Sequence, residues 1–411
     1  MTNIHALIES KTNELKDEII SFVQQMVQTP SLANEEGTVQ KLIFDKLQSL
    51  DLQSDTIPVK FDDIKDHPAF NDDGFSPDSR INVIGQWNSN KKGKSLILNG
   101  HVDVVPTGPE KLWNESPWSG AIKNDRIYGR GSCDMKAGLA SGIFAVQVLK
   151  SIGFEPSGNI MIQSVIGEES GGCGTLTNIV KGYKADAAVI LEPTSLKLCP
   201  IQSGALTFRL IIPGKATHAA MRWDGVSAIE KFNVVSQSII EFEKKRHSSF
   251  SVEYYKSPER VAPINIGTIR GGEWHSTVPE SVVAEGRLGV FPGESVSNAR
   301  MAFSEHLKEV SASDSWLKEN PPILEWFEGQ FESGKTDVDH AIINNLEMAY
   351  KEVNNSSAKI EGVTYGSDLR LFTNHADIPS VLFGPGDVRL AHSANEYVKI
   401  CLLYTSDAAD E

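Results

Sequence analysis

The spacing of hydrophobic and polar residues predicts alternating helices and strands in the first half of the chain. Residues 12–28 carry apolar side chains at helical intervals, so we expect an amphipathic helix there. Short apolar runs then alternate with helix-sized segments, which is typical of βαβ units and a mostly parallel sheet. The expected strands are 81–87, 95–99, 159–166 and 187–191, with a loop at 62–80 and a helix at 137–150.

The pattern changes near Ser203, where strands and helices follow one another in the order β-α-β-β-α. This order predicts a small α+β, ferredoxin-like domain at 204–313, inserted into an α/β domain made of 1–203 and 314–400. The inserted elements are strands at 205–213, 264–272 and 282–290 and helices at 223–245 and 296–310. The α/β pattern returns from about Pro322, with a helix at 339–353 and a strand at 380–384.

The last residues, 401–411, read CLLYTSDAADE and do not continue the preceding pattern. They resemble a translated sequencing adapter, so we expect a non-native tail and give Cys401 no weight. The alternative is a short, polar, natural C-terminus. If the tail is foreign, we expect exposed apolar surface at the sheet edge and a lower melting temperature than in a chain whose native C-terminus is restored.

Composition narrows the classes of partner. Lys and Arg number 39 against 54 Asp and Glu, a formal net charge of −15, which disfavours both nucleic acid and anionic membranes. No apolar run approaches the roughly 18 residues of a membrane span, and the N-terminus lacks a signal-peptide pattern. Four cysteines without a C-x-x-C pair suit a reducing compartment, so we expect a soluble, cytoplasmic protein.

Acidic and histidine residues stand where expected strands end. Because the carboxyl ends of parallel strands meet at one edge of a sheet, these residues are candidates to converge. His, Asp and Glu without Cys suit Zn²⁺ or Co²⁺, and also Mn²⁺. Two such ions, about 3.5–4 Å apart, need a bridging carboxylate, and Asp134 in a glycine-rich turn is the natural choice. The full set is His101, Asp103, Asp134, Glu168, Glu169, Glu192 and His392.

Each of these signals has an ordinary structural explanation. An H-x-D pair is usually surface polarity, adjacent glutamates are usually solvated, and Asp134 could simply complement a helix dipole. The run G-R-G-S-C-D lacks the third glycine of a dinucleotide fingerprint, and Cys133 has no histidine partner. No G-x-S-x-G run supports a serine hydrolase. The combination, in this order, favours a metal site.

Seven short runs carry a resemblance to a known family: HVDVVP (101–106), YGRGSCDMKAG (128–138), IGEESGG (166–172), LEPT (191–194), GKATHAA (214–220), YGSDLR (365–370) and AHSANEYV (391–398). Together they resemble the M20 metallopeptidase family, in the branch of acetylornithine deacetylase and succinyl-diaminopimelate desuccinylase. The resemblance extends to about Ile400. It implies a di-metal catalytic domain, with the inserted domain as the dimerisation domain of a homodimer.

The resemblance also implies a ligand set. One metal ion would be held by His101, Asp134 and Glu192, and the other by Asp134, Glu169 and His392.

Three further residues acquire roles from the resemblance. Asp103 would orient His101 through its other ring nitrogen. Glu168 would be the general base that takes a proton from the water between the metals. His218, more often a structural residue when considered alone, would reach the partner subunit's active site and stabilise the oxyanion.

Substrate binding is predicted from fewer signals. Arg287 and Arg370 could each clamp an α-carboxylate, since guanidinium offers a bidentate fork, or could form structural salt bridges. Family members commonly carry Asn before the V-P step of the inserted domain, whereas this chain has His275 and Ser276. That departure concerns the substrate pocket, not the metal ligands.

These observations favour a di-metal amidohydrolase that cleaves the amide of an N-acyl amino acid, with acetylornithine deacetylation as the best single hypothesis. One alternative keeps the mechanism but changes the substrate, as in a dipeptidase, a carboxypeptidase or another N-acyl deacylase. A more distant alternative is a non-catalytic binding protein on the same fold, which would be expected to have lost a ligand or the base.

Overall fold

The computed structural model describes residues 2–76 and 79–404, and its chain divides into two compact units. Unit 1 comprises residues 1–200, 335–361 and 371–411, and unit 2 comprises residues 201–334 and 362–370. The chain passes between the units within β8 (Leu198–Gln202), β13 (Gly334–Lys335), β14 (Ile360–Val363) and α10 (Leu369–His375).

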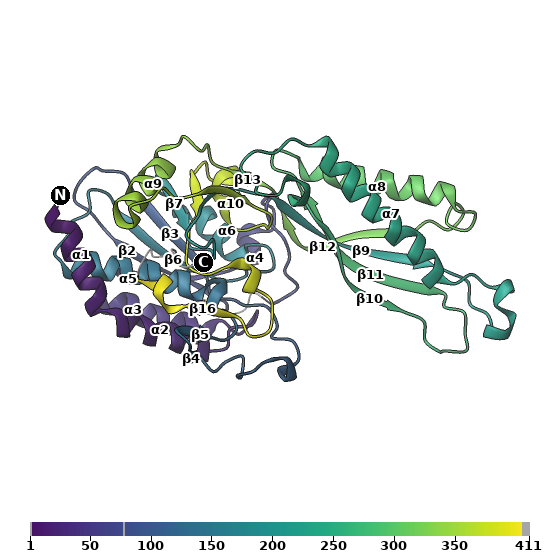
Figure 1. The fold of residues 1–411 in the computed structure, drawn as a ribbon, viewed down its shortest axis with the longest axis horizontal. Coiled ribbons are helices and arrows are strands. Elements are labelled where there is room, and N and C mark those ends of the chain that lie inside the picture. The colour runs from purple at the N-terminus through teal and green to yellow at the C-terminus, as the bar shows by residue number, and fades with distance from the viewer. Residues whose placement is uncertain (1, 77–78, 405–411) are drawn as a thin grey trace. The chain divides into compact units, whose positions relative to one another are not determined.

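Unit 1 is built on a sheet whose central strands run parallel (Figure 1). The strand order of this nine-stranded sheet is β1-β2-β6-β3-β7-β15-β8-β13, with β14 beside β8. Strands β6, β3, β7 and β15 are mutually parallel, β2 is antiparallel to β6, and β1 is antiparallel to β2. These strands are β1 (Gln53–Pro58), β2 (Ile81–Trp87), β3 (Leu96–His101), β6 (Ile160–Val165), β7 (Ala187–Ile190) and β15 (Ser380–Leu382). Residues in β6 and β7 are buried almost continuously, as expected of strands covered on both faces.

Helices and a small second sheet complete unit 1. The helices are α1 (Thr2–Glu14), α2 (Lys16–Gln28), α3 (Gly37–Ser49), α4 (Phe61–Ile64), α5 (Ala137–Ser151), α6 (Cys173–Val180) and α9 (Ala341–Asn354). The small antiparallel sheet has the order β16-β5-β4, with β4 (Ala121–Lys123), β5 (Arg126–Tyr128) and β16 (Tyr397–Lys399). The mixed α/β fold class, with a mostly parallel central sheet, is confirmed.

Unit 2 has a four-stranded antiparallel sheet with α7 and α8 on one face (Figure 1). Burial alternates along β9, so that Leu206, Phe208, Leu210 and Ile212 point into one core with both helices. The strand order is β10-β11-β9-β12, and the elements are β9 (Gly204–Pro213), α7 (Ala228–Ser249), β10 (Ile264–Gly271), β11 (Ser281–Val290), α8 (Val296–Ser313) and β12 (Ile323–Phe331).

The structure corrects the expectation that α/β texture resumes at Pro322. Strand β12 pairs with β9 and places Leu324 and Trp326 against the core of unit 2, so this unit continues well past residue 313. The pairing register shifts between Trp326 and Gln330, which interrupts the alternation that would have marked β12 as one strand.

Smaller differences concern element ends. The helix expected at 12–28 is two helices that meet at Leu15, and α4 overlaps the start of the expected loop 62–80. The helix expected from residue 223 begins at Ala228, because the Ser227 hydroxyl accepts a hydrogen bond from the Glu230 N–H at its first turn. Of the expected foreign tail, residues 405–411 lie outside the described part of the chain.

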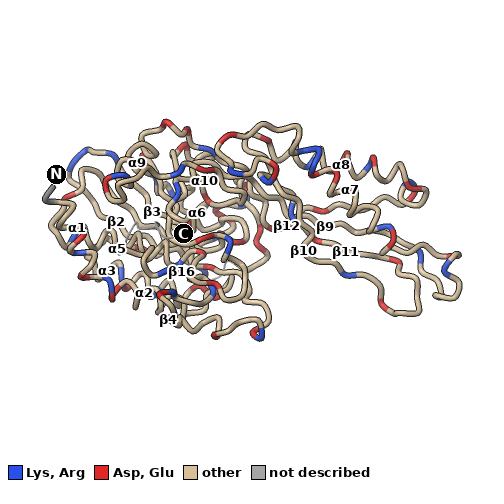
Figure 2. Tube along the Cα trace, viewed as in Figure 1, with Lys and Arg blue, Asp and Glu red and all other residues tan. Residues whose placement is uncertain are grey.

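Surface charge is mixed. Figure 2 shows acidic and basic residues interspersed along the helices of each unit, so the net negative charge is not gathered on one element. Among residues 2–76 and 79–404, the structure has no helix that is both long enough and apolar enough to cross a membrane.

Close packing of α5 on the sheet gives a stability prediction. A Cβ added at Gly138 would overlap the backbone oxygen of Leu191, whereas one added at Gly37, in the first turn of α3, would meet nothing within 4 Å. We expect Gly138→Ala to cost about 1–3 kcal/mol of unfolding free energy, because backbone must move to accept the methyl group. Gly37→Ala is the matched control and should leave the urea midpoint unchanged or slightly raised. Equal midpoints for both variants would contradict the packing argument.

Candidate metal centre

Three neighbouring parallel strands place the first group of candidate residues. In the order β6-β3-β7, His101 is the last residue of β3, Glu168 lies three residues beyond β6, and Glu192 lies two residues beyond β7. His101 pairs with Val165 of β6 in the register of the sheet. The expected convergence at the carboxyl edge is therefore what the structure shows.

Asp134 lies between two histidines. Its Oδ1 is 3.2 Å from Nε2 of His101, and its Oδ2 is 3.5 Å from Nε2 of His392. The turn that carries it (Ser132–Lys136) begins after Gly131, which has φ +79° and whose Cβ, if present, would press on Val104. One carboxylate thus directs each of its oxygens toward a different imidazole.

Two further carboxylates complete a group around each histidine. Glu192 Oε1 is 3.9 Å from Nε2 of His101, and Glu169 Oε2 is 3.0 Å from Nε2 of His392. Glu168 Oε2 lies 3.8 Å from Nε2 of His101. Two groups have ligand atoms that all lie within 4.8 Å of one another, His101 with Asp134 and Glu169, and His101 with Glu168 and Glu192. The division of the ligands into the two sets that the resemblance implies stays a prediction.

The charge of this cluster fits divalent cations. The carboxylates are largely buried, with side-chain exposure of 12% for Asp134, 14% for Glu169 and 5% for Glu192. Burying several carboxylates together is costly unless positive charge compensates them. Two imidazoles cannot balance them, whereas an oxygen- and nitrogen-lined cluster with a shared carboxylate suits two divalent ions.

Asp103 contacts the other ring nitrogen of His101, as expected, but through its backbone oxygen rather than its carboxylate. The Nδ1 of His101 lies 2.9 Å from the backbone oxygen of Asp103, and 3.7 Å from its carboxylate. The Asp103 carboxylate instead accepts hydrogen bonds from the backbone N–H groups of Glu168, at 3.3 Å, and Glu169, at 3.1 Å. Asp103 therefore fixes the His101 ring through its main chain and the two-glutamate loop through its side chain.

The same charges shift proton affinities in the metal-free protein. The Glu169 carboxylate, acting against burial and together with Asp134, raises the pKa of His392 to about 11. Burial opposes charge on His101, but the hydrogen bond that its ring donates to Asp134 and the surrounding carboxylates raise its pKa well above the ordinary value. Burial and the neighbouring Asp134 raise the pKa of Glu169.

The remaining predicted residues belong to unit 2. His218 is exposed and its Nδ1 accepts a hydrogen bond from the Ala220 N–H. Arg287 donates to the Thr364 carbonyl at 3.1 Å, and burial lowers its pKa. Arg370 is 1% exposed, lies 3.9 Å from Glu332 and stacks over Phe331. Substrate binding by either arginine stays a prediction.

Sequence reasoning missed two residues that support the metal centre. Glu396 is fully buried and accepts hydrogen bonds from the backbone N–H groups of Cys133 and Asp134, and Arg130 pairs with it. Both lie inside runs that carried the family resemblance. A charged residue four positions from each of two candidate ligands, Asp134 and His392, was the available signal.

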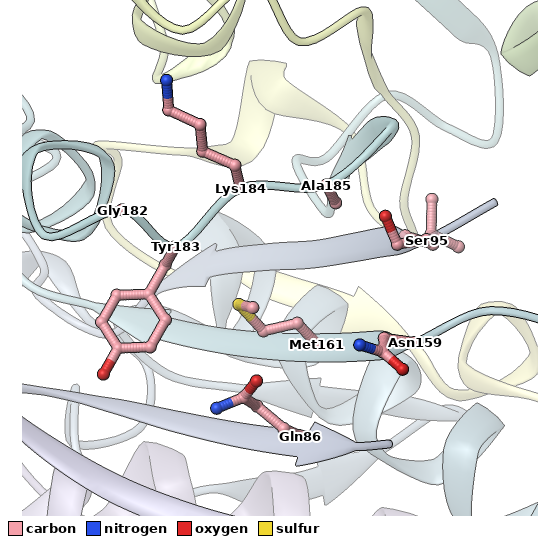
Figure 3. Close-up of a pocket in the computed structure, with 9 residues that line it drawn as sticks. Gln86, Ser95, Asn159, Met161, Gly182, Tyr183, Lys184 and Ala185 are labelled. Carbon is pink, nitrogen blue, oxygen red and sulfur yellow. The ribbon is translucent and has the colours of Figure 1, made fainter. Parts of the chain in front are cut away.

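A separate pocket of about 320 Å³ lies at the opposite, amino edge of the central strands (Figure 3). Its lining includes Ser95, Asn159, Met161 and Tyr183, and none of its described lining residues is a carboxylate or a histidine. The candidate chemistry of unit 1 is therefore at the carboxyl edge.

An α/β sheet with histidines and a shared carboxylate at its carboxyl edge is typical of metal-dependent hydrolases. Comparison with known proteins agrees with this class: residues 97–406 match Peptidase family M20/M25/M40. The chain belongs to that family and is a hydrolase of amide bonds.

Its relatives differ in substrate. The chain is 30% identical over 420 residues to N-formyl-4-amino-5-aminomethyl-2-methylpyrimidine deformylase of Bacillus subtilis, covering 96% of this chain and 93% of that one. It is 24% identical over 408 residues to a probable succinyl-diaminopimelate desuccinylase of Staphylococcus aureus, covering 93% of each. A Bacillus subtilis structure described as a dinuclear metal binding peptidase from the M20 family superposes with a TM-score of 0.60 at 16% identity, covering 95% of each chain.

Metal binding should release protons. At about pH 8, His392 carries a proton because its pKa in the metal-free protein is about 11, and a metal ligand must give that proton up. Calorimetric Zn²⁺ titration in two buffers of different ionisation enthalpy should therefore show proton release, and affinity should be tighter at about pH 9 than at about pH 7. His392→Asn should release about one proton fewer. An enthalpy independent of buffer would contradict this account.

Proposed function

We propose that this protein is a di-metal hydrolase that removes a small acyl group from a primary amine. The observation that carries the proposal is the position of Asp134, whose two carboxylate oxygens face two different imidazoles at 3.2 and 3.5 Å. A shared carboxylate between two ligand sets is the arrangement that a pair of divalent ions requires.

The residues divide into two sets around Asp134. We assign His101 and Glu192 to one ion and Glu169 and His392 to the other, with Zn²⁺ or Co²⁺ as the favoured metals. When bound, the ions would polarise the scissile carbonyl and activate water for attack. The dinuclear metal-binding relative supports the stoichiometry of two.

Glu168 is our candidate for the general base. Its side chain is 8% exposed and reaches the cluster at His101, but it belongs to neither assigned ligand set. Its backbone N–H donates a hydrogen bond to the Asp103 carboxylate, which holds the main chain from which the side chain extends. A carboxylate held beside the reacting centre can accept a proton from water and then deliver it to the leaving amine.

The acyl group is the finer part of the proposal. The relative at 30% identity is a deformylase of an aminomethylpyrimidine and another relative is a desuccinylase, so small N-acyl amines are the favoured class. We place an N-formyl aminomethyl heterocycle first and N-acetylornithine second, with dipeptides as the alternative within the family.

We also propose a homodimer in which His218 completes the partner's site and stabilises the oxyanion. His218 is exposed, and the two segments that hold its backbone also carry Trp223 and Trp274, which are 85% and 64% exposed. Aromatic surface of this kind is typical of a protein interface.

The described cysteines form no disulfide, which supports a cytoplasmic location.

Replacing the proposed base tests the chemistry. Glu168→Gln should lower turnover of the preferred substrate by about 100- to 10,000-fold while leaving bound metal unchanged, because proton transfer is lost and the ligand sets are kept. The panel is the N-formyl aminomethylpyrimidine, N-acetylornithine, N-succinyl-diaminopimelate and a dipeptide, assayed with metal content measured in parallel. Glu155→Gln, on the exposed surface, is the matched control and should retain full activity.

Two results would count against the proposal. Purified protein that holds no divalent metal after reconstitution would remove the di-metal assignment. Full activity in Glu168→Gln would remove Glu168 as the base while leaving the metal assignment intact.

Mixing two inactive variants tests the shared site. His218→Ala and Glu168→Gln each disable both sites of their own homodimer, but a heterodimer has one site with both defects and one site with neither. Random exchange of subunits should therefore restore about a quarter of the wild-type rate. No recovery, in a mixture shown to contain heterodimers by mass spectrometry, would mean that His218 serves its own subunit or none.

A further inference from the structure

A buried ion pair lies behind the Asp134 turn. Arg130 is 2% exposed and Glu396 is 0% exposed, and their charged groups meet at 2.6 Å between Nη1 and Oε2. Neither residue is a member of the ligand sets. A buried pair of this kind contributes little net stability, because desolvation offsets most of the attraction, so its value must lie elsewhere.

The other carboxylate oxygen of Glu396, Oε1, contacts the turn that carries Asp134. Glu396 Oε1 accepts hydrogen bonds from the backbone N–H of Cys133, at 2.9 Å, and of Asp134, at 3.1 Å. A charged acceptor makes a stronger hydrogen bond than a neutral one. These two bonds hold the peptide that carries the Asp134 side chain, whose carboxylate oxygens lie beside His101 and His392.

The guanidinium of the pair connects the other two ligand segments. Arg130 donates to the backbone oxygen of Pro106, in the segment that follows His101, at 3.2 Å, and to that of Ser393, next to His392, at 3.3 Å. Its planar group also lies over the Trp113 ring at 5.4 Å. One arginine therefore contacts the segments of both histidines while it holds the carboxylate that supports Asp134.

Main-chain pairing joins the segment that carries Arg130 to the segment that carries Glu396. The N–H of Gly129 donates to the carbonyl of Glu396 at 2.9 Å, and β16 continues the pairing with β5, with Tyr397 opposite Tyr128. The ion pair therefore lies directly beside the paired strands β5 and β16. There the side chains of Arg130 and Glu396 join the two segments where the strand pairing ends.

We propose that Arg130 and Glu396 form a positioning unit that holds Asp134 in register between His101 and His392, so that both metal positions depend on it. This inference rests on the proposed metal centre. Residues that orient metal ligands without touching the metal commonly control its affinity.

The test uses metal binding, not activity, as its readout. Glu396→Gln keeps an acceptor for the two N–H groups, but it turns an amide toward Arg130 and removes the charge. Arg130→Lys keeps the charge and loses the fork that reaches Pro106 and Ser393. Zn²⁺ affinity is measured by competition with a chromophoric chelator, and the absorption spectrum of the Co²⁺-loaded protein reports ligand geometry.

A matched buried pair serves as the control. In unit 2, Arg246 meets Glu294 at 2.6 Å, both side chains are 6% exposed, and Glu294 accepts a hydrogen bond from the Phe291 N–H. No candidate ligand lies in those described segments. Glu294→Gln should lower the melting temperature to a similar degree without changing metal binding.

We expect Glu396→Gln to weaken Zn²⁺ binding by about 10- to 100-fold and to alter the Co²⁺ spectrum, with Arg130→Lys in the same direction. Unchanged affinity and spectrum in both variants would overturn the inference, and so would equal losses in the Glu294→Gln control. If Glu396→Gln does not fold, Arg130→Lys decides alone. A wild-type protein that binds no metal would instead refute the proposed metal centre.

Discussion

The accumulation of buried negative charge at one sheet edge is the constraint on which the rest of unit 1 depends. Asp134 and Glu169 have little exposure, and both lie beside the imidazole of His392, with that of His101 on the other side of Asp134. Such a group is expensive to bury unless hydrogen bonds and cations compensate it. The surrounding structure supplies the first kind of compensation, and in our proposal divalent ions supply the second.

Backbone N–H groups around the cluster are engaged by carboxylates just outside the ligand sets. Asp103 holds the loop of Glu168 and Glu169, and Glu396 holds the turn of Asp134. Each support is itself buried, so solvent does not compete for its hydrogen bonds. The side chains at the centre therefore point in fixed directions before any metal or substrate arrives, which is what efficient catalysis by positioning requires.

The two units make different contributions to the proposed reaction. Unit 1 contains every candidate ligand and the candidate base, while unit 2 contains His218, Arg287 and Arg370. Relatives of this chain are named as a deformylase and as a probable desuccinylase, so membership of the family does not fix the acyl group. The departures at His275 and Ser276 belong to unit 2 as well.

Much of this protein could be predicted from the sequence by itself, because the relevant signals are local. Hydrophobic period marked the strands at 81–87 and 282–290 to within a residue, and polar residues after apolar runs marked the ligands at the strand ends. These features follow from a few neighbouring positions, so distant parts of the chain do not change them.

Only the tertiary structure decided which distant groups meet. In the structure, β12 pairs with β9 in the sheet of unit 2. The Asp103 carboxylate accepts hydrogen bonds from two backbone N–H groups rather than from His101. Arg130 forms an ion pair with Glu396, which is 266 positions away in the sequence. A hydrogen bond between side chain and main chain leaves no periodic trace, since its geometry depends on how separate loops are folded against each other. The candidate ligands could be named from the sequence, whereas the hydrogen bonds that hold the main chain of Asp134, Glu168 and Glu169 became visible only in the folded chain.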